Sequence, residues 1–339
     1  MIRSCNSIFS GSLLPFSIAR AAVPTGRMLS RKLSMNPSQS AVVLRQFKVM
    51  EEAWEKTPSG HRLLNDHFSM SHSENQLDLK GFAVGFGIHG TLTNFGSTVQ
   101  VNAVSHFFQK HFNKKLTNEQ IREKMGCGKK EYFADLWWKA LGTKLTLWEA
   151  ERCYPKFEEV LMEHIEADGS EILPDVFEIF KKIKDAEGLT FTTTGYAKQL
   201  AAPILSNFQK QGLKFDVEVT GDMVSAGRGH PYGDMIRKAG ALLKIKPERI
   251  IHIDDTLIGG MAHVDAMCTG VIVLTGDTLE ISKEELCQLS PSALEERVFK
   301  AEKKARAHSK FVIPRLNMLD QVFWNVINLS RLMSALGRD

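Results

Sequence analysis

The segment GFAVGFGIHGTLTNFG, residues 81–96, has the features of an active-site loop but lacks a reactive side chain where one is expected. Phe82, Val84 and Phe86 alternate with small residues, the period of a buried strand, and a Gly-Thr turn follows. A strand that opens into such a turn usually delivers an acid, a serine or a phosphate-binding loop at its carboxyl end. Gly87 stands at that place. The segment therefore predicts the position of an active site without its reactive group.

Polar residues also follow the later predicted strands. These strand-end residues are Thr193, Thr194 and Gly195, then Gly221 and Asp222, then Asp254, Asp255 and Thr256. The carboxyl ends of parallel strands meet at one edge of a sheet, so these residues are expected to lie near Gly87. Neighbouring side chains on a strand point to opposite faces. We therefore expect only one of Asp254 and Asp255 to face the site.

The elements that position these residues follow a strand–helix alternation after residue 188. The predicted strands are 189–194, 215–220, 249–255 and 270–276, and the predicted helices are 197–210, 232–243 and 260–267. Strands that alternate with helices of this length predict a parallel sheet covered on both faces, which is a doubly wound α/β fold.

A block of predicted helices separates the first strand from this alternation. The helices are expected at 98–114, 129–141 and 147–167, with a capping box from Thr117 to Gln120 and a further helix at 174–187 that starts with Pro174. We interpret residues 98–170 as an inserted α-helical cap domain. The pair Trp137 and Trp138 is expected to be cap core with one ring partly exposed.

Five short motifs follow one another along the chain: FGIHGTLTNFGS (86–97), MGCGK (125–129), TTTGY (192–196), AGRGHP (226–231) and IDDT (253–256). In this order they resemble the nucleophile loop, the cap lysine motif, and the second, third and metal-binding fourth motifs of the haloacid dehalogenase superfamily and, within it, of the phosphonoacetaldehyde hydrolases (phosphonatases). The resemblance covers about residues 80–335. It implies a Rossmann-like haloacid dehalogenase fold, with the tail from EELCQ to KFVI in C-terminal helices.

The resemblance also implies a chemistry, in which a carboxylate attacks phosphorus beside Mg²⁺ while a cap lysine holds the aldehyde as a Schiff base. By position, Lys129 matches that lysine, Thr193 and Thr194 the phosphate-binding hydroxyl region, Arg228 the cationic phosphate clamp and Asp255 a metal ligand. Each has a structural alternative. Lys129 opens a helix, where a solvated charge is common, and Arg228 lies in a Gly-rich loop, where surface arginines are common.

Four positions depart from the family pattern. Gly87 occupies the nucleophile position, Asn94 and Gly259 stand where the family has acids, and Tyr132 replaces a cap histidine. Glycine has no side chain that could attack phosphorus or bind Mg²⁺. We therefore predict a pseudoenzyme in which the matching residues are relics, with no catalytic residue and no cofactor. Weak Mg²⁺ binding through Asp255 is the alternative.

The composition is that of a globular protein with one large or two modest domains, and no run of about 18 apolar residues predicts a membrane span. The five cysteines lack metal-ligand spacing, which fits a reducing compartment. The first 50 residues hold seven of the 43 Lys and Arg and none of the 39 Asp and Glu. The remaining chain thus carries 36 basic and 39 acidic residues, a net charge of −3, which leaves no electrostatic footprint for nucleic acid.

Residues 1–40 have the composition of a mitochondrial presequence. They contain four arginines spread among nine serines, and the first acidic residue of the chain is Glu51. A secretory signal and a disordered tail are the alternatives. Residues 41–80 are predicted to be an N-terminal extension, with a helix at 41–56 and a polar, loop-like stretch at 58–76. The core is expected to comprise 81–97 and 171–339.

Three function classes follow from the sequence. The favoured one is a noncatalytic subunit or assembly factor that binds protein partners in a mitochondrial complex, such as the mitochondrial ribosome or its assembly intermediates. The second is a sensor that holds a phosphate or aldehyde ligand without turnover. The third is a residual hydrolase, or an enzyme that forms an imine on Lys129. A homodimer formed through the cap is compatible with each class.

Overall fold

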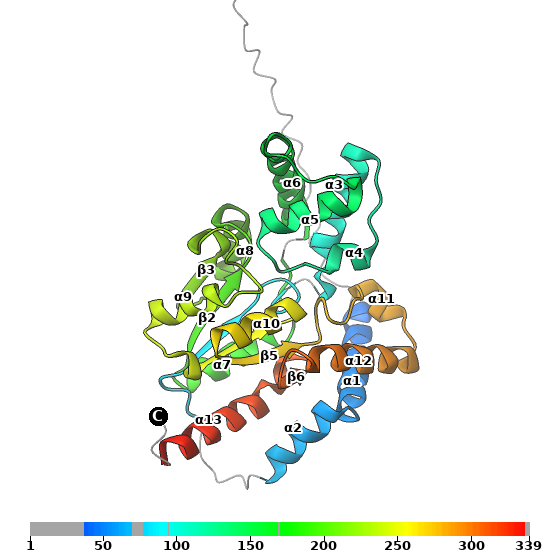
Figure 1. Cartoon of the computed structure of the whole chain (residues 1–339). Helices are drawn as coiled ribbons and strands as arrows, with labels where there is room; N and C mark the ends of the chain where they lie inside the picture. Colours follow the sequence, from blue (N-terminus) through cyan, green and yellow to red (C-terminus); the bar gives the residue numbers. More distant parts are fainter. Residues whose placement is uncertain (1–36, 70–76, 94, 169, 336–339) are drawn as a thin grey trace, which may run out of the picture. The chain divides into compact units, whose positions relative to one another are not determined.

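The computed structural model describes residues 37–69, 77–93, 95–168 and 170–335 (Figure 1). Most of the predicted presequence and the departure at Asn94 therefore lie outside the described residues. The described residues, from Pro37 onward, group as one compact unit. No helix in the described ranges is both long and apolar enough to cross a membrane.

Six strands of the described chain form one sheet in the order β3-β2-β1-β4-β5-β6. They are β1 (Ala83–Phe86), β2 (Leu189–Thr194), β3 (Val217–Thr220), β4 (Ile250–Asp254), β5 (Thr269–Val273) and β6 (Phe311–Ile313). Every neighbouring pair is parallel. The prediction of a doubly wound parallel sheet is confirmed.

The strand order reverses beside β1. The chain runs outward from β1 to β2 and β3 and then returns to the other side of β1 at β4. The carboxyl ends of β1 and β4 therefore flank the switch point, where open α/β sheets bind their ligands. The residues after these two strands are Gly87 and Asp255.

Gly85 shapes the middle of the sheet. It pairs with Phe191 of β2 and His252 of β4, and all residues of β1 are buried. A Cβ atom on residue 85 would lie 2.1 Å from the Phe191 ring and 2.7 Å from the His252 ring. Glycine is required here because the two larger side chains occupy the face of the sheet over β1.

Helices cover the sheet where the alternation predicts them. They are α7 (Val176–Asp185), α8 (Lys198–Lys210), α9 (Asp234–Leu243) and α10 (Leu257–Ala266). The inward residues of α9 and α10, among them Ile236 and Ala262, pack with Phe191 and Val219 in one apolar cluster. Short 3-10 turns lie at η1 (Phe95–Ser97), η2 (Gly221–Met223), η3 (Pro247–Arg249) and η4 (Leu316–Met318).

A helical block is inserted between β1 and β2, as predicted. It comprises α3 (Thr98–Phe112), α4 (Asn118–Arg122), α5 (Lys129–Leu141) and α6 (Leu147–Asp168). Its core is aromatic, with the ring of Phe107 5.7 Å from Phe133 and 5.5 Å from Phe157. The capping box of Thr117 is confirmed. Trp137 is buried and Trp138 is 55% exposed, also as predicted.

The N-terminal extension is more regular than its composition indicates. It forms α1 (Pro37–Glu55) and α2 (Pro58–Ser69), so the loop-like prediction was wrong for 58–69. The two helices pack against α12 (Pro291–Arg306), β6 and α13 (Leu319–Ala335), with α11 (Lys283–Gln288) beside α1. The tail was expected to be helical throughout, but Phe311–Ile313 pairs with β5 as a strand because its partner is supplied by the tertiary fold.

Candidate functional site at the ends of β1 and β4

The loop after β1 is held against β4 by backbone hydrogen bonds. Gly87 donates its N–H to the carbonyl of Ile253 at 2.9 Å. The chain then turns at Gly90, which has a φ of +81° and donates to the carbonyl of Thr93 at 2.6 Å. Only glycine adopts this left-handed conformation without strain. The turn fixes the path from the strand to the cap.

Asp254 occupies the space beside Gly87. A Cβ atom on residue 87 would lie 3.0 Å from Asp254 Oδ2 and 3.0 Å from the Thr91 hydroxyl. Asp254 Oδ1 is fixed by the Thr256 backbone N–H at 2.8 Å and hydroxyl at 2.7 Å. On Gly259, a Cβ atom would lie 2.3 Å from Asp254 Cγ. Asp254 thus fills volume that side chains at 87 and 259 would need.

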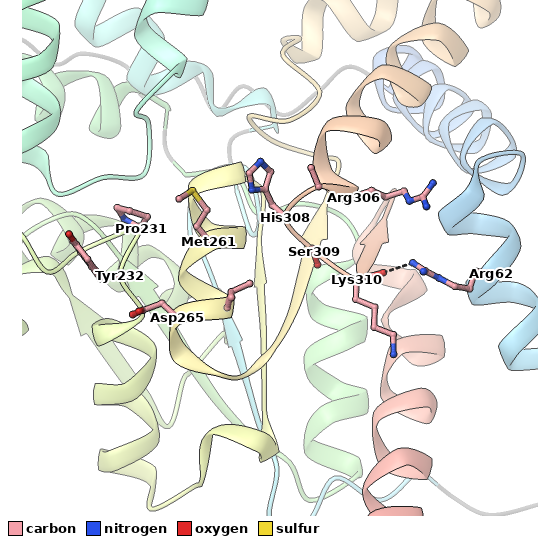
Figure 2. Close-up of a pocket in the computed structure, with 11 residues that line it drawn as sticks. Arg62, Pro231, Tyr232, Met261, Asp265, Arg306, His308, Ser309 and Lys310 are labelled. Carbon is pink, nitrogen blue, oxygen red and sulfur yellow. Dashed lines mark hydrogen bonds between the residues drawn. The ribbon is translucent and has the colours of Figure 1, made fainter.

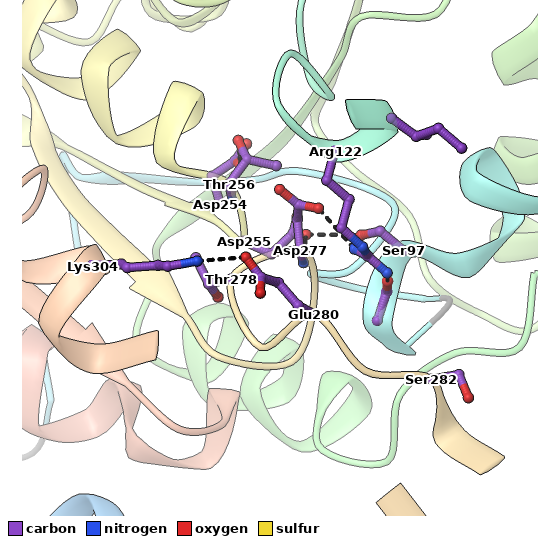
Figure 3. Close-up of polar contacts among 12 residues, drawn as sticks. Ser97, Arg122, Asp254, Asp255, Thr256, Asp277, Thr278, Glu280, Ser282 and Lys304 are labelled. Carbon is purple, nitrogen blue, oxygen red and sulfur yellow. Dashed lines mark hydrogen bonds and ion pairs between the residues drawn. The ribbon is translucent and has the colours of Figure 1, made fainter. Parts of the chain in front are cut away.

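Asp255 is fixed by three donors. Its Oδ1 accepts from the Thr91 hydroxyl at 3.1 Å, and its Oδ2 accepts from the Ser97 hydroxyl at 2.9 Å and the Asp277 N–H at 2.7 Å (Figure 3). Because β4 ends at Asp254, Asp255 lies in the following turn and strand alternation does not separate the two carboxylates. Both therefore border the loop after β1, and the expectation that only one would do so was wrong.

Arg122 of the cap reaches the same place. Its Nη1 lies 2.8 Å from Asp277 Oδ1, and its Nη2 donates to the carbonyl of Gly96 at 2.7 Å. Both charged side chains are largely buried. Figure 3 shows Arg122 and Asp277 beside Ser97 and Asp255. The contact joins the cap to the loop after β5.

The three carboxyl groups, Asp254, Asp255 and Asp277, are called the acid cluster below. Burial raises the pKa of Asp254 to about 6, and it raises those of Asp255 and Asp277 to about 7. The Asp254 carboxylate adds to the rise at Asp255, whereas Arg122 opposes the rise at Asp277. Near pH 7, Asp255 and Asp277 are therefore protonated in about half of the molecules, whereas Asp254 is mostly ionised.

The acid cluster does not fit a Mg²⁺ site. Asp255 Oδ2 already accepts two hydrogen bonds, and Asp254 Oδ1 accepts two from Thr256. Mg²⁺ takes oxygen ligands in near-octahedral geometry at about 2.1 Å, usually one or two carboxylates together with waters or phosphate. Across the ranges that the structure describes, no group of three or more His, Cys, Asp or Glu is arranged to hold a metal ion. Asp255 is instead a hydrogen-bond hub.

Lys129 is buried, contrary to the solvated alternative. Its ammonium lies 3.5 Å from Gln100 Oε1, 4.6 Å from the centre of the Tyr196 ring and 5.4 Å from that of Tyr132. Burial lowers the pKa of Lys129 to about 8. The amine therefore loses its proton far more readily than a surface lysine, which is a requirement for nucleophilic attack on a carbonyl.

Two histidines border Lys129. Burial and the nearby lysine charge lower the pKa of His89 to about 3 and that of His230 to about 4, so both rings are neutral at physiological pH. The Nε2 atom of each ring is buried without a protein hydrogen-bond partner. His89 also packs edge-on against Tyr196, with ring centres 5.3 Å apart. Sequence reasoning did not select either histidine.

Thr193 does not present its hydroxyl to the loop after β1. The hydroxyl lies 2.9 Å from His252 Nε2, and His252 Nδ1 lies 2.9 Å from His263 Nε2 of α10. The three side chains are buried under α10, and the absence of a side chain on Gly85 leaves the room for this chain. Thr193 is thus committed to a polar network within the core.

The other predicted phosphate-binding residues lie apart from that network. Thr194, at the end of β2, is half-buried and accepts from the Tyr196 N–H at 3.2 Å. The Arg228 guanidinium forms an ion pair with Asp234 at 2.5 Å and stacks on Tyr232 at 4.2 Å. Their phosphate-binding roles stay predictions.

Tyr132 has a structural place in the cap. Its ring is buried and its hydroxyl donates to the carbonyl of Ile121 at 2.8 Å. A tyrosine hydroxyl bound in this way ties α5 to α4. The substitution at Tyr132 is therefore explained by cap packing.

Sequence reasoning missed Ser97, Arg122 and Asp277. One signal was available for Asp277, because it directly follows the predicted strand 270–276 and thus falls at the same edge of the sheet. Arg122 and Ser97 carried no such signal, since their contacts depend on how the cap meets the core.

Comparison with known sequences identifies the class. The sequence model of the haloacid dehalogenase-like hydrolase family matches residues 83–262, more than half of the chain. The chain belongs to this family. Within it, the chain is phosphonatase-like: it is 27% identical to the phosphonoacetaldehyde hydrolase of Bacillus cereus (strain ZK / E33L) over 227 residues, 64% of this chain and 84% of that protein.

A second relative is longer. The chain is 26% identical over 260 residues to a bifunctional phosphonoacetaldehyde hydrolase/aminoethylphosphonate transaminase of Clostridioides difficile (strain 630), which covers 73% of this chain and 40% of that protein. Among solved structures, a phosphonoacetaldehyde hydrolase-like protein from Oleispira antarctica has a TM-score of 0.67 at 24% identity, covering 74% of this chain and 93% of that one. A hydrolase from Pseudomonas syringae has a TM-score of 0.55 at 21% identity, covering 71% and 99%. These structures share the fold.

Proposed function

We propose that this protein is a noncatalytic phosphonatase-like member of its family that serves as a structural subunit or assembly factor in a mitochondrial complex. The observation that carries the proposal is the packing around Gly87. No side chain extends from this residue, and Asp254 lies 3.0 Å from where its Cβ would be. The related hydrolases suggest a common origin, and this position is where the present chain departs from their expected chemistry.

The missing nucleophile has a large energetic consequence. Removing a covalent nucleophile lowers turnover by on the order of 10⁶ in other enzymes, about 8 kcal/mol of barrier. Asp254 is a poor replacement because two hydrogen bonds from Thr256 hold one of its oxygens. The hydrogen bonds that already hold Asp254 and Asp255 argue against a bound Mg²⁺, which is the second element of phosphoryl-transfer catalysis.

The stable core supports a scaffold role. Asp255 satisfies donors from Thr91, Ser97 and the Asp277 backbone, so it ties the loops after β1 and β5 together. Arg122 adds the cap to this network. Polar groups that bind one another hold these loops and the cap in one arrangement. We expect a subunit of a complex to need such a fixed arrangement.

The mitochondrial part of the proposal rests on the N-terminal composition. A fusion of residues 1–40 to a fluorescent protein is expected to enter mitochondria, and a variant with Arg3, Arg20, Arg27 and Arg31 changed to Ala is expected to stay outside. Uniform cytosolic fluorescence of the unchanged fusion would contradict the targeting proposal without affecting the proposal on catalysis.

Two measurements test the central proposal. Purified protein is incubated with phosphonoacetaldehyde and Mg²⁺, and phosphate release is expected at background. A tagged chain, purified from mitochondria under mild conditions, is expected to sediment with a large complex in stoichiometric amount. Turnover within about a hundredfold of an ordinary enzyme's roughly 10 s⁻¹ excludes the noncatalytic role. Sedimentation as a free monomer or dimer excludes the subunit role.

A second candidate is a carbonyl-binding protein that forms an imine on Lys129. The observation in its favour is the buried amine with a pKa of about 8, beside the unpartnered Nε2 atoms of His89 and His230. Treatment with phosphonoacetaldehyde and borohydride would reduce such an imine to a stable amine. A mass increase on Lys129 that is absent from Lys129→Arg supports this candidate, and an unmodified Lys129 excludes it.

A further inference from the structure

A pocket of about 770 Å³ lies beside α10, on a different part of the molecule from Gly87. We call it the outer groove. Its walls come from α10, from the segment before α9, from the end of α12 with the loop to β6, and from α2 (Figure 2). The lining residues used below are Arg62, Tyr232, Met261, Val264, Arg306 and Lys310. Its volume is in the range of functional binding sites.

The outward face of α10 is apolar. Met261 is 46% exposed and Val264 is 72% exposed, one turn apart on the helix, and Met267 follows at 73%. The inward face is also complete, because Ala262 and Ala266 are buried in the core and His263 bonds to His252. Asp265 is also exposed on this helix, but its carboxylate pairs with Arg237, so the other outward side chains, Met261 and Val264, present the apolar surface. The outward face of α10 therefore has the character of an interface.

Cationic side chains line one end of the outer groove. Figure 2 shows Arg62, Arg306 and Lys310 on the side formed by α2, α12 and the loop to β6. Arg62 donates to the Lys310 carbonyl at 2.8 Å, a contact that orders the loop without neutralising either charge. Arg306 lies 3.6 Å from Glu302, which is buried. Arg306 is therefore partly balanced by Glu302, and the exposed positive charge at this end comes from Arg62 and Lys310.

The negative charge at the opposite end is already balanced. Asp265 lies 2.8 Å from Arg237 and accepts the Gly233 N–H at 2.7 Å. Tyr232 stands beside it, half-exposed under the Arg228 guanidinium. The outer groove thus offers an apolar and aromatic floor followed by a positive rim, in a protein whose body carries a net charge of −3.

The geometry points to the outer groove as the docking site for an acidic, amphipathic segment of a protein partner. Apolar side chains of the segment would cover Met261 and Val264, and its carboxylates would pair with Arg62, Arg306 and Lys310. A groove with an aliphatic, Met-containing floor is suited to a helical peptide. The chain's own first 36 residues are excluded as the occupant by charge, because they hold basic residues and no acids.

The inference deepens the proposed function and rests on it in one respect, namely that the protein acts through a partner. It adds the face that binds and the chemistry of what is bound. It is independent of the chemistry at Gly87.

The test uses the full-length protein in its own mitochondria. A photo-crosslinking amino acid replaces Val264, and a control chain carries it at Leu329, which is 52% exposed on α13. After irradiation, the crosslinked peptides are identified by mass spectrometry. A crosslink at 264 but not at 329, to a segment that combines acidic and apolar residues, is the expected result.

The identified segment is then synthesised and titrated against purified protein. Lys310→Glu and Val264→Asp are each expected to weaken binding about tenfold or more, and Leu329→Asp to leave it within about twofold. Raising the salt concentration is expected to weaken binding as well. Circular dichroism and melting curves verify that each variant is folded.

Other outcomes overturn the inference. They are a crosslink to RNA, to a second copy of this chain or to a segment without acidic residues, equal crosslinking at 264 and 329, and binding unchanged by Lys310→Glu. Co-sedimentation with the large complex distinguishes failure of the outer-groove inference from failure of the proposed function. If the chain joins the complex but position 264 forms no crosslink, only the role of the outer groove is contradicted. If the chain joins no complex, the proposed function is contradicted too.

Discussion

The acid cluster and the outer groove use charged side chains in opposite ways. In the acid cluster, Asp255 takes up three internal donors and Asp277 faces Arg122, so the charges are directed at one another. In the outer groove, Lys310 and Arg62 face outward around the apolar face of α10. Family membership directs attention to the acid cluster, but its carboxyl groups are already engaged in internal hydrogen bonds and an ion pair. The second region has the exposed surface that a partner can bind.

The largest expected effect concerns the catalytic position. Restoring the acid with Gly87→Asp is expected to leave phosphonoacetaldehyde turnover about 10⁶-fold below that of an ordinary enzyme. The new side chain would start 3.0 Å from Asp254 Oδ2 and add a fourth carboxyl to the acid cluster. Phosphate release measures this directly.

A second variant tests whether crowding by Asp254 contributes to the effect of Gly87→Asp. Adding Asp254→Gly to Gly87→Asp removes the steric and electrostatic conflict, so the double variant is expected to melt at a higher temperature than the single one. Strong hydrolysis by the single variant would show that Asp254 is no obstacle, and the description of the acid cluster as closed would be wrong.

The next effect concerns stability. Asp255→Ala is expected to lower the free energy of unfolding by about 3–5 kcal/mol, because it leaves the Thr91, Ser97 and Asp277 donors buried without their acceptor. Denaturant unfolding gives the value. Asp255→Asn keeps the size and part of the bonding, so it should lose less. Equal losses for both variants would indicate that the hydrogen bonds contribute little.

The acid cluster also predicts a dependence on pH. The pKa of Asp254 rises from 3.8 to about 6 on folding, so the folded state holds the extra proton between these values, and stability is lost as the pH rises from about 4 to about 6. Asp254→Asn removes this loss. Relative to the unchanged protein, the variant should gain about 3 kcal/mol from this group between pH 4 and pH 7, and more because loss of the Asp254 charge also lowers the pKa of Asp255.

The buried histidines act in the opposite sense. The pKa values of His89, His230 and His263 fall from 6.5 to about 3–4, so their contribution is present above pH 6.5 and is lost as the pH decreases below it. This contribution is common to Asp254→Asn and the unchanged protein, so it cancels in the difference between their unfolding curves. A difference that stays constant from pH 4 to pH 7 would contradict the pKa assigned to Asp254.

The smallest effect is expected in the outer groove. Val264→Asp should change the free energy of unfolding by no more than about 0.5 kcal/mol, because the side chain is 72% exposed. Ala262→Asp, on the buried face of the same helix, is the matched control and should destabilise strongly. A large loss for Val264→Asp would mean that this face stabilises the fold itself, and the contrast with the acid cluster would disappear.

The sequence predicts the parts of the fold that local pattern determines. The period of residues 189–194 and the buried run before Asp255 give β2 and β4, and α5 is predicted with its observed bounds. In contrast, α2 is polar and becomes helical by packing on α13 and β6, and β6 itself has three residues that depend on β5 as a partner. Such elements require tertiary contacts, which single-sequence patterns do not contain.

The candidate site, too, could be predicted only in part from the sequence. Motif order predicts that Gly87 and Asp255 lie close together, because both follow strands that end at one edge. It does not predict the side-chain partners. Thr193 bonds to His252 because Gly85 leaves the face of β1 open, and Asp255 borders the loop because β4 ends one residue earlier. Both facts depend on positions in neighbouring strands.

The pairing of α1 with the end of the chain affects how the protein is made. The indole of Trp54 is buried and donates to the carbonyl of Val312, 258 residues later, at 2.9 Å. At typical rates of synthesis, of about 5–20 residues per second, the ribosome needs about 10–50 s to add that length. During this time α1 lacks the partners that come from α12 and from Val312. The packing of α1 is thus completed only after the last strand, β6, has been synthesised.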